Sequence, residues 1–366
     1  MDRVAGLFQT LRRALAAGIT AAAALAGAAC SGAPLHPGAM PGAPAQVAPL
    51  AGTGASFLYT GGGKISKYGL GDSRPQRSVQ DQVAAQALTL DRFGNLFAGN
   101  FNGSWGSITV YDARDLTLLR SINGIDNIRS LATDRQGYLY AAVCYPGIYV
   151  FAPGSTHIDY RITRGAKSVC SLGFDSAGDL YGSDVIGHKV SVYAPSATPG
   201  HVHFVRRITN GLRFPSPLLL DRSDNLYVAN CADCYFGGAG HPSGFVSEFA
   251  PGASSPSRII SAGVYHPFAL AVDSSGRLYV GNRPVGSKAY KNGFVSVYAP
   301  GATKPLRRIT DGINVPGSLA TDPAGNLYVA NLYADTVTVY SPGGAKLLRT
   351  IRRGVQIAAA VLVGAP

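Results

Sequence analysis

From residue 57 to the end of the chain, apolar and polar residues alternate in short runs, separated by turns rich in glycine, proline, asparagine and aspartate. A period of two residues is typical of β-strands with one buried face. Four such runs follow one another in the fullest example, LATDPAGNLYVANLYADTVTVYSPGGAKLLRTI, residues 319–351. The pattern predicts an all-β protein made of short antiparallel strands.

The same phrase recurs around an aspartate that opens a D-x-x-G-N turn between the first and second runs. Six copies occur at intervals of 41 to 52 residues, close to the length of one four-stranded propeller blade. Their aspartates are Asp91, Asp134, Asp175, Asp221, Asp273 and Asp322. An aspartate in such a turn accepts backbone N–H groups, and the glycine supplies the left-handed backbone. We therefore interpret the six aspartates as turn residues and not as a ring of metal ligands.

The number of blades depends on the two ends of the repeat region. The third run occurs seven times, starting at Ile65, Ile108, Ile148, Val190, Val246, Val295 and Val337. The first copy lacks a first strand, whereas residues 357–363 look like a first strand with nothing after it. Pairing the two ends completes a seventh blade and removes the free sheet edges. The sequence thus predicts one seven-bladed β-propeller over residues 57–366, with four-stranded antiparallel blades closed by pairing the C-terminal strand with the N-terminal blade.

The repeated phrase, with its NLYVAN run, resembles NHL-type and YVTN-type propeller repeats across residues 57–363. Related propellers include scaffolds, ligand binders, gluconolactonase-type hydrolases and streptogramin lyases, so the fold alone does not choose an activity. The resemblance implies that both enzyme groups use a glutamate with a metal, whereas the sole glutamate here, Glu248, falls inside a predicted strand. A lactonase or lyase with a divalent metal is therefore the alternative to a binding protein, for which no cofactor is predicted.

Two long insertions between second and third strands fall on adjacent blades, at residues 231–245 and 283–294, and lie on one face of the propeller. Aromatic and polar side chains of this kind are suited to binding a glycan or a peptide. They are Tyr235, Phe236, His241, Arg283, Tyr290 and Lys291. The alternative is that both insertions are merely long surface loops.

A polar residue also ends the second strand of five blades: Asn100, Asp184, Asn230, Asn282 and Asn331. Such residues either form a ring of ligands around a central channel or hydrogen-bond to their own backbone. The alternative enzyme would use Asp184, His188 and His266 for acid–base chemistry, because all three are expected on this same face.

The charge of the chain does not change the predicted function. The chain carries 32 basic and 20 acidic side chains, a formal net charge of +12, and such a surplus favours polyanions. No dense basic run or aromatic-rich basic motif occurs, so no specific nucleic-acid partner is expected. We interpret three arginine pairs in fourth strands as edge protection, with a basic rim for acidic polymers as the alternative. The pairs are Arg206–Arg207, Arg307–Arg308 and Arg352–Arg353.

The first 29 residues, basic and then apolar and small, have the pattern of a signal peptide, and Cys30 follows at once. A cysteine at this place resembles the lipobox of bacterial lipoproteins, although Gly27 stands where an aliphatic residue is usual. Residues 31–56 are rich in alanine, proline and glycine, and we expect a disordered tether. The prediction is an exported lipoprotein of the cell envelope that touches the membrane only through its lipid; ordinary cleavage and secretion is the alternative.

Four further cysteines, Cys144, Cys170, Cys231 and Cys234, predict two disulfides in an oxidising compartment. Cys144 and Cys170 are expected at the same end of neighbouring blades, and the other two lie in the first long insertion. A zinc site is the less favoured alternative. The leading hypothesis from the sequence is a non-catalytic envelope propeller that binds a glycan, peptide or protein partner through the two insertions.

Overall fold

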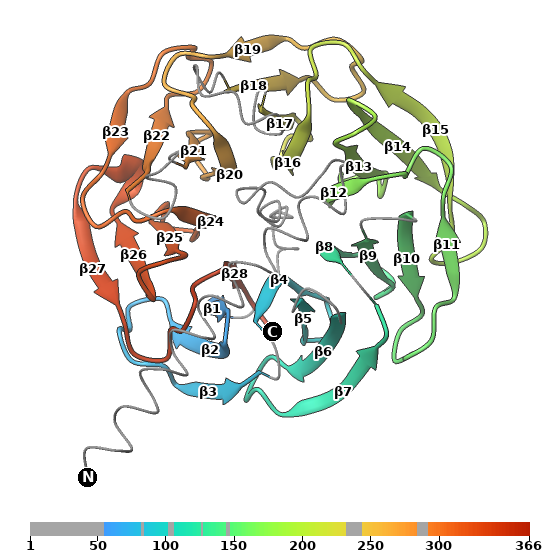
Figure 1. The fold of residues 1–366 in the computed structure, drawn as a ribbon, viewed down its shortest axis with the longest axis horizontal. Coiled ribbons are helices and arrows are strands. Elements are labelled where there is room, and N and C mark those ends of the chain that lie inside the picture. Colours follow the sequence, from blue (N-terminus) through green and yellow to red (C-terminus); the bar gives the residue numbers. More distant parts are fainter. Residues whose placement is uncertain are drawn as a thin grey trace, which may run out of the picture.

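The computed structural model describes residues 55–81, 84–101, 106–125, 127–143, 147–231, 244–283 and 292–366. These residues form seven four-stranded antiparallel sheets arranged around a central axis (Figure 1). The predicted all-β, seven-bladed propeller is confirmed. Among the described residues, no helix is long and apolar enough to span a lipid bilayer.

The four strands of each blade follow one another from the central axis outward. Blade 1 consists of β28 (Ala360–Gly364), β1 (Phe57–Gly61), β2 (Lys64–Gly69) and β3 (Arg77–Gln80). Blade 2 consists of β4 (Ala85–Leu90), β5 (Asn95–Phe101), β6 (Gly106–Asp112) and β7 (Leu118–Asn123). Blade 3 consists of β8 (Ile128–Thr133), β9 (Leu139–Val143), β10 (Gly147–Phe151) and β11 (Tyr160–Ile162). Blade 4 consists of β12 (Val169–Phe174), β13 (Leu180–Asp184), β14 (Lys189–Pro195) and β15 (Val202–Ile208).

The remaining blades have the same order. Blade 5 consists of β16 (Pro215–Leu220), β17 (Leu226–Cys231), β18 (Gly244–Phe249) and β19 (Arg258–Ile260). Blade 6 consists of β20 (Pro267–Val272), β21 (Leu278–Asn282), β22 (Phe294–Tyr298) and β23 (Arg307–Ile309). Blade 7 consists of β24 (Pro316–Thr321), β25 (Leu327–Asn331), β26 (Thr336–Tyr340) and β27 (Leu347–Ile351), with a short 3-10 helix, η2 (Pro342–Gly344), before β27.

The ring closes as predicted, through a blade that combines the two ends of the propeller. β28 pairs antiparallel with β1, and Leu58 faces Val363 in the register. Without this pairing the inner edge of β1 would present unpaired backbone groups. The closing strand begins at Ala360, three residues later than the expected start at residue 357.

The hydrophobic core lies between the blades rather than within any one of them. The cluster between blades 6 and 7, for example, packs Tyr279 and Val297 against Leu319 and Val329. Inner strands such as β8 and β9 are buried along their whole length, so each sheet is buried on both faces and needs an apolar neighbour on each side.

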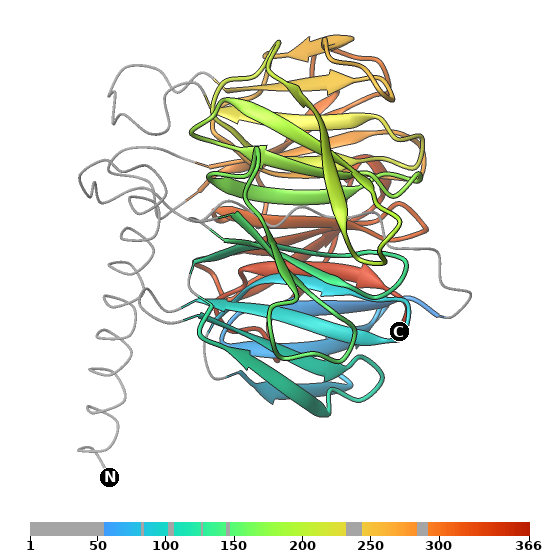
Figure 2. The ribbon, with the colours of Figure 1, turned by 90° about the vertical axis from the view of Figure 1, so that its right-hand side faces the viewer.

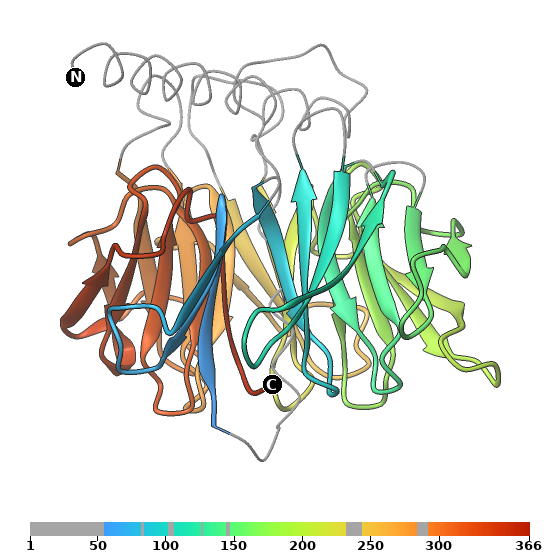
Figure 3. The same cartoon turned by 90° about the horizontal axis from the view of Figure 1, so that it is seen from below.

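The propeller has two faces, and Figures 2 and 3 show it from the side, with one face at each edge of the view. We call "turn face" the one that carries the D-x-x-G turns, where β28 ends and where the C terminus lies in Figure 3. The opposite "loop face" carries the connections from second to third strands and from one blade to the next. Most of both long insertions lies outside the described residues.

Candidate functional site

The D-x-x-G turns are built as the sequence predicts. In blade 4, Asp175 Oδ1 accepts the backbone N–H groups of Ala177 and Asp179 at 3.0 and 2.8 Å. Gly178 takes the left-handed conformation, with φ of +90°. The other carboxylate oxygen accepts the hydroxyl of Tyr181 at 3.2 Å. Because both carboxylate oxygens already accept hydrogen bonds from the turn and from the tyrosine, the aspartate acts as a turn residue and not as a metal ligand.

In blades 3, 6 and 7 the tyrosine of the second strand extends the turn toward the next blade, a contact that the sequence pattern does not predict. The Tyr140 hydroxyl of blade 3 lies 3.3 Å from Asp134 Oδ2 and 2.6 Å from the Gly200 carbonyl oxygen of blade 4. Burial raises the pKa of Asp134. The recurrence of tyrosine six residues after the aspartate is the signal in the sequence that could have revealed this contact.

Three neighbouring turns surround a cavity of about 690 Å³ on the turn face. Its walls come from the turns of blades 3, 4 and 5 and from the β14–β15 connection, and residues of both ends of the propeller lie at its inner side. A smaller hollow of about 160 Å³ continues past blade 5 toward blades 6 and 7. The site predicted from the sequence lies on the opposite face, so sequence reasoning missed this cavity.

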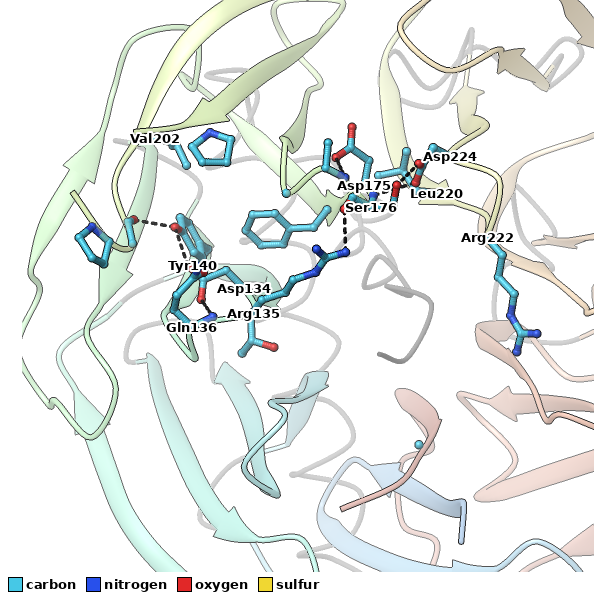
Figure 4. A pocket seen from close by; sticks show the side chains of 18 of the residues that line it. Asp134, Arg135, Gln136, Tyr140, Asp175, Ser176, Val202, Leu220, Arg222 and Asp224 are labelled. Carbon is cyan, nitrogen blue, oxygen red and sulfur yellow. Dashed lines mark hydrogen bonds between the residues drawn. The ribbon is translucent and has the colours of Figure 1, made fainter. Parts of the chain in front are cut away.

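A chain of hydrogen bonds links the three turns across the blade boundaries (Figure 4). Arg135 of blade 3 donates to the carbonyl oxygen of Ser176 of blade 4 at 2.6 Å. Ser176 in turn donates its backbone N–H to Asp224 of blade 5 at 2.8 Å, and its hydroxyl donates to the same carboxylate. The wall of the cavity is therefore pre-organised by contacts between blades.

Arg222 is the second arginine that lines the cavity. It occupies in blade 5 the turn position that Arg135 occupies in blade 3, directly after the anchoring aspartate. Figure 4 shows its side chain extending away from its own turn and from Asp224. Both arginines are exposed, and neither forms an ion pair with another described residue.

His201 lines the cavity and stacks on Tyr160, which is not part of the lining. The rings of His201 and Tyr160 stack with their centroids 4.0 Å apart and their planes within 8°. His201 Nε2 lies 3.5 Å from Asp159 Oδ2, and the Tyr160 hydroxyl accepts the N–H of Val202 at 2.9 Å. The cavity thus combines guanidinium, carboxylate and aromatic groups, which is the mixed lining of a site for a polar ligand.

On the loop face, the polar residues that end the second strands are all buried completely. Asn100 donates to the side chains of Ser107 and Thr109, whereas the others accept backbone N–H groups. Asn230 Oδ1 accepts the N–H of Arg213 at 2.9 Å, and its amide group donates to the Val228 carbonyl oxygen. Asn282 and Asn331 accept N–H groups of the preceding blade connections in the same way. These side chains tie blades 5, 6 and 7 to the connections that enter them, as the local alternative predicts.

The three residues of the alternative enzyme have separate partners. Asp184 is fully buried, accepts the N–H of Gly187 and lies 3.3 Å from Lys189 Nζ. His188 Nδ1 accepts the N–H of Phe214 at 3.0 Å. In another blade, burial and the neighbouring charge of Arg283 lower the pKa of His266 to about 3. Within the part of the chain that the structure describes, no three histidine, cysteine, aspartate or glutamate residues gather where they could hold a metal ion.

Of the remaining predicted residues, Arg283 is buried and its guanidinium lies 4.3 Å from the centre of the Phe268 ring. Cys231 ends β17 and is buried. The other candidates of the two insertions and the lipidation site fall outside the described residues, and their roles stay predictions. They are Tyr235, Phe236, His241, Tyr290, Lys291, Cys234 and Cys30.

The predicted disulfide between Cys144 and Cys170 is wrong, because Cys170 is a free cysteine. It is a free, buried thiol at a bulge near the start of β12, and burial raises its pKa to about 11. The bulge of the inner strand directs this residue into the protein, where the charges of Arg129 and Asp184 act on it. Cys144 itself lies outside the described residues.

No protein-family model and no curated protein matches the chain. Solved structures do match it. A functionally unknown protein from Desulfotomaculum acetoxidans is 11% identical, with 85% of this chain and 99% of that chain covered and a TM-score of 0.65. A candidate 6-phosphogluconolactonase from Bacteroides fragilis is 14% identical, with coverages of 86% and 99% and a TM-score of 0.64. The hydrazine synthase of Kuenenia stuttgartiensis is 15% identical, with coverages of 77% and 90% and a TM-score of 0.60.

Proposed function

We propose that this propeller is a non-catalytic binding module of the cell envelope, and that its ligand, a glycan or a short peptide, occupies the turn-face cavity. The cavity of about 690 Å³ carries the proposal, because its size falls within the range of about 300–1,000 Å³ that is usual for ligand sites. The likeness to solved propellers supports the fold alone.

The lining supports binding rather than catalysis. Its carboxylates accept several hydrogen bonds from their own turns or from Ser176, so they are poorly placed to take a proton from a substrate. Hydroxyl, guanidinium and aromatic groups instead offer hydrogen bonds and stacking to a polar ligand. The envelope location rests on the predicted signal peptide and on Cys30.

A tryptophan in the cavity tests the proposal. Ala177 is an exposed residue of the blade 4 turn and lines the cavity. Ala177→Trp should fill the site and weaken ligand binding about tenfold or more, because a bound ligand cannot share the space. The measurement is binding to an array of bacterial envelope oligosaccharides and to a library of short peptides.

The matched control is Ala324→Trp, at the equivalent turn position of blade 7, which is exposed and borders neither hollow. A ligand should bind the control as it binds the unaltered protein. Equal binding by the Ala177→Trp protein, or no binding of any glycan or peptide to the unaltered protein, would contradict the proposal.

A further inference from the structure

We infer that the ligand of the turn-face cavity is an acidic chain whose separate anionic groups contact Arg135 and Arg222. This inference rests on the proposed function and adds the chemical class of the ligand. The two arginines occupy the same turn position in blades 3 and 5, and both line the cavity. Because the turn of blade 4 lies between them, a single carboxylate does not serve both, whereas a chain with repeated acidic groups does.

The positive charge of Arg135 is available to a ligand. Its partner is the neutral carbonyl oxygen of Ser176, at 2.6 Å, and no carboxylate of the described chain forms an ion pair with it. The contact fixes one nitrogen of the guanidinium and leaves the other N–H groups for a ligand. A guanidinium fixed in this way loses less entropy when it binds an anion.

Arg222 offers its whole guanidinium. No hydrogen bond or ion pair joins it to another residue of the described ranges, and its side chain extends away from its turn (Figure 4). Guanidinium groups recognise carboxylate and phosphate groups through two parallel hydrogen bonds. The two arginines therefore provide two separate anchor points for acidic groups.

Four carboxylates also line the cavity, and their negative charges oppose an anion that approaches them. Three of them belong to the turn aspartates, and each is surrounded by two turn N–H groups and a tyrosine hydroxyl: Asp134, Asp175 and Asp221. The fourth, Asp224, accepts both donors of Ser176. These hydrogen bonds hold the four carboxylates in the wall but leave their negative charge in place, so the anionic groups of a ligand must bind at the two arginines, which no carboxylate pairs within the described ranges.

Calorimetric titration at constant ionic strength tests the inference, with two acidic chains that represent different sources of the same chemistry. Trigalacturonate supplies carboxylates on a sugar chain, and tripolyphosphate supplies phosphates. The uncharged methyl ester of trigalacturonate is the matched neutral probe. We expect at least one acidic chain to bind. If trigalacturonate binds, its methyl ester should bind about tenfold or more weakly, because the ester lacks the carboxylate charges.

The double variant Arg135→Gln/Arg222→Gln should lose about tenfold or more in affinity for the acidic chain, and each single variant should lose part of it. The control is Arg74→Gln/Arg352→Gln, which removes the same charge from exposed arginines of other blades and should bind normally. A thermal melt of each variant verifies that it is folded.

Three results would overturn the inference. The first is that neither acidic chain binds. The second is that the Arg135→Gln/Arg222→Gln variant loses no more affinity than the control variant, because the two arginines then do not bind the acidic groups specifically. The third is that the methyl ester binds as well as trigalacturonate. If the Ala177→Trp protein then fails to bind the ester, the proposed cavity stands and only its acidic ligand is wrong.

Discussion

Burial decides what the polar side chains of this propeller can do. Asn230, Asn282 and Asn331 are fully buried, and each accepts a backbone N–H group that no strand would otherwise satisfy. An unpaired backbone group in such a place costs about 1–3 kcal/mol. The same residue type at a strand end is therefore a structural device here, whereas a ligand ring would need the amides in the open channel.

His266 shows the effect of burial on titration. Its pKa is lowered to about 3, from a usual value of about 6.5, by burial and by the charge of Arg283. Between these values the unfolded chain binds the proton and the folded chain does not, so this histidine makes the folded state less stable as the pH falls from about 6.5 toward 3.

Replacing this histidine should change the acid sensitivity of the protein. His266→Gln should reduce the loss of unfolding free energy between pH 6.5 and 4 by about 1 kcal/mol or more. Urea unfolding at several pH values measures the effect, and His157→Gln, at an exposed position, is the control. Parallel pH profiles for the unaltered protein and the His266→Gln variant would show that this histidine does not carry the effect.

At the scale of strands and blades, neighbouring sheets are joined by side chains that reach across the gap. Arg206 of an outer strand donates to the Ala253 carbonyl oxygen of the next blade at 3.1 Å, and Arg349 donates to that of Leu70. The sequence pattern indicates edge protection for the arginines of outer strands. These two also stabilise the contact between blades, which a pattern within one strand does not indicate.

Tyr279 joins blades 6 and 7 through one buried hydroxyl, which donates to Asp273 at 2.8 Å and accepts the N–H of Gly343 at 2.9 Å. Tyr279→Phe leaves both partners without this hydroxyl, and the unfolding free energy should fall by about 1–3 kcal/mol. Chemical denaturation measures this change. The control is Tyr149→Phe, because the Tyr149 hydroxyl makes no hydrogen bond to another described residue and its ring packs under Arg161, at 4.7 Å. Equal effects of the two substitutions would contradict the bridging role.

At the scale of the whole molecule, stability depends on closing the ring. β28 supplies the inner strand of blade 1, and Val361, Leu362 and Val363 are all buried. Each such side chain contributes about 1.5–3 kcal/mol through burial, and three of them together approach the total stability of about 5–15 kcal/mol typical of a folded protein.

Removal of residues 360–366 should therefore abolish the folded monomer. The expected result is loss of the cooperative thermal transition, together with aggregation through the opened edge of β1. Circular dichroism melting and size-exclusion chromatography measure these outcomes. Removal of residues 365–366 alone keeps β28 intact and is the control. A cooperative, monomeric protein without β28 would show that closure is dispensable.

The sequence by itself determined the number of blades, the strands of each blade and the closure by the C-terminal strand. These features could be predicted because each is carried by a local signal: the alternation within a strand, and an aspartate such as Asp175 with a glycine such as Gly178 in the turn that follows. A local signal repeated around a ring also fixes the arrangement of the blades, since each must bury two faces against similar neighbours.

Only the tertiary structure decided where the candidate site lies. The cavity brings together Arg135, Ser176 and Arg222, which follow the turn aspartates of three separate blades; the repeat places them in equivalent turns but does not show that these turns enclose a cavity. Asn230 and Cys170 are also buried, which their positions near strand ends did not reveal. The physical reason is that a binding surface is made of contacts between repeats, whereas the sequence repeat encodes the contacts within one.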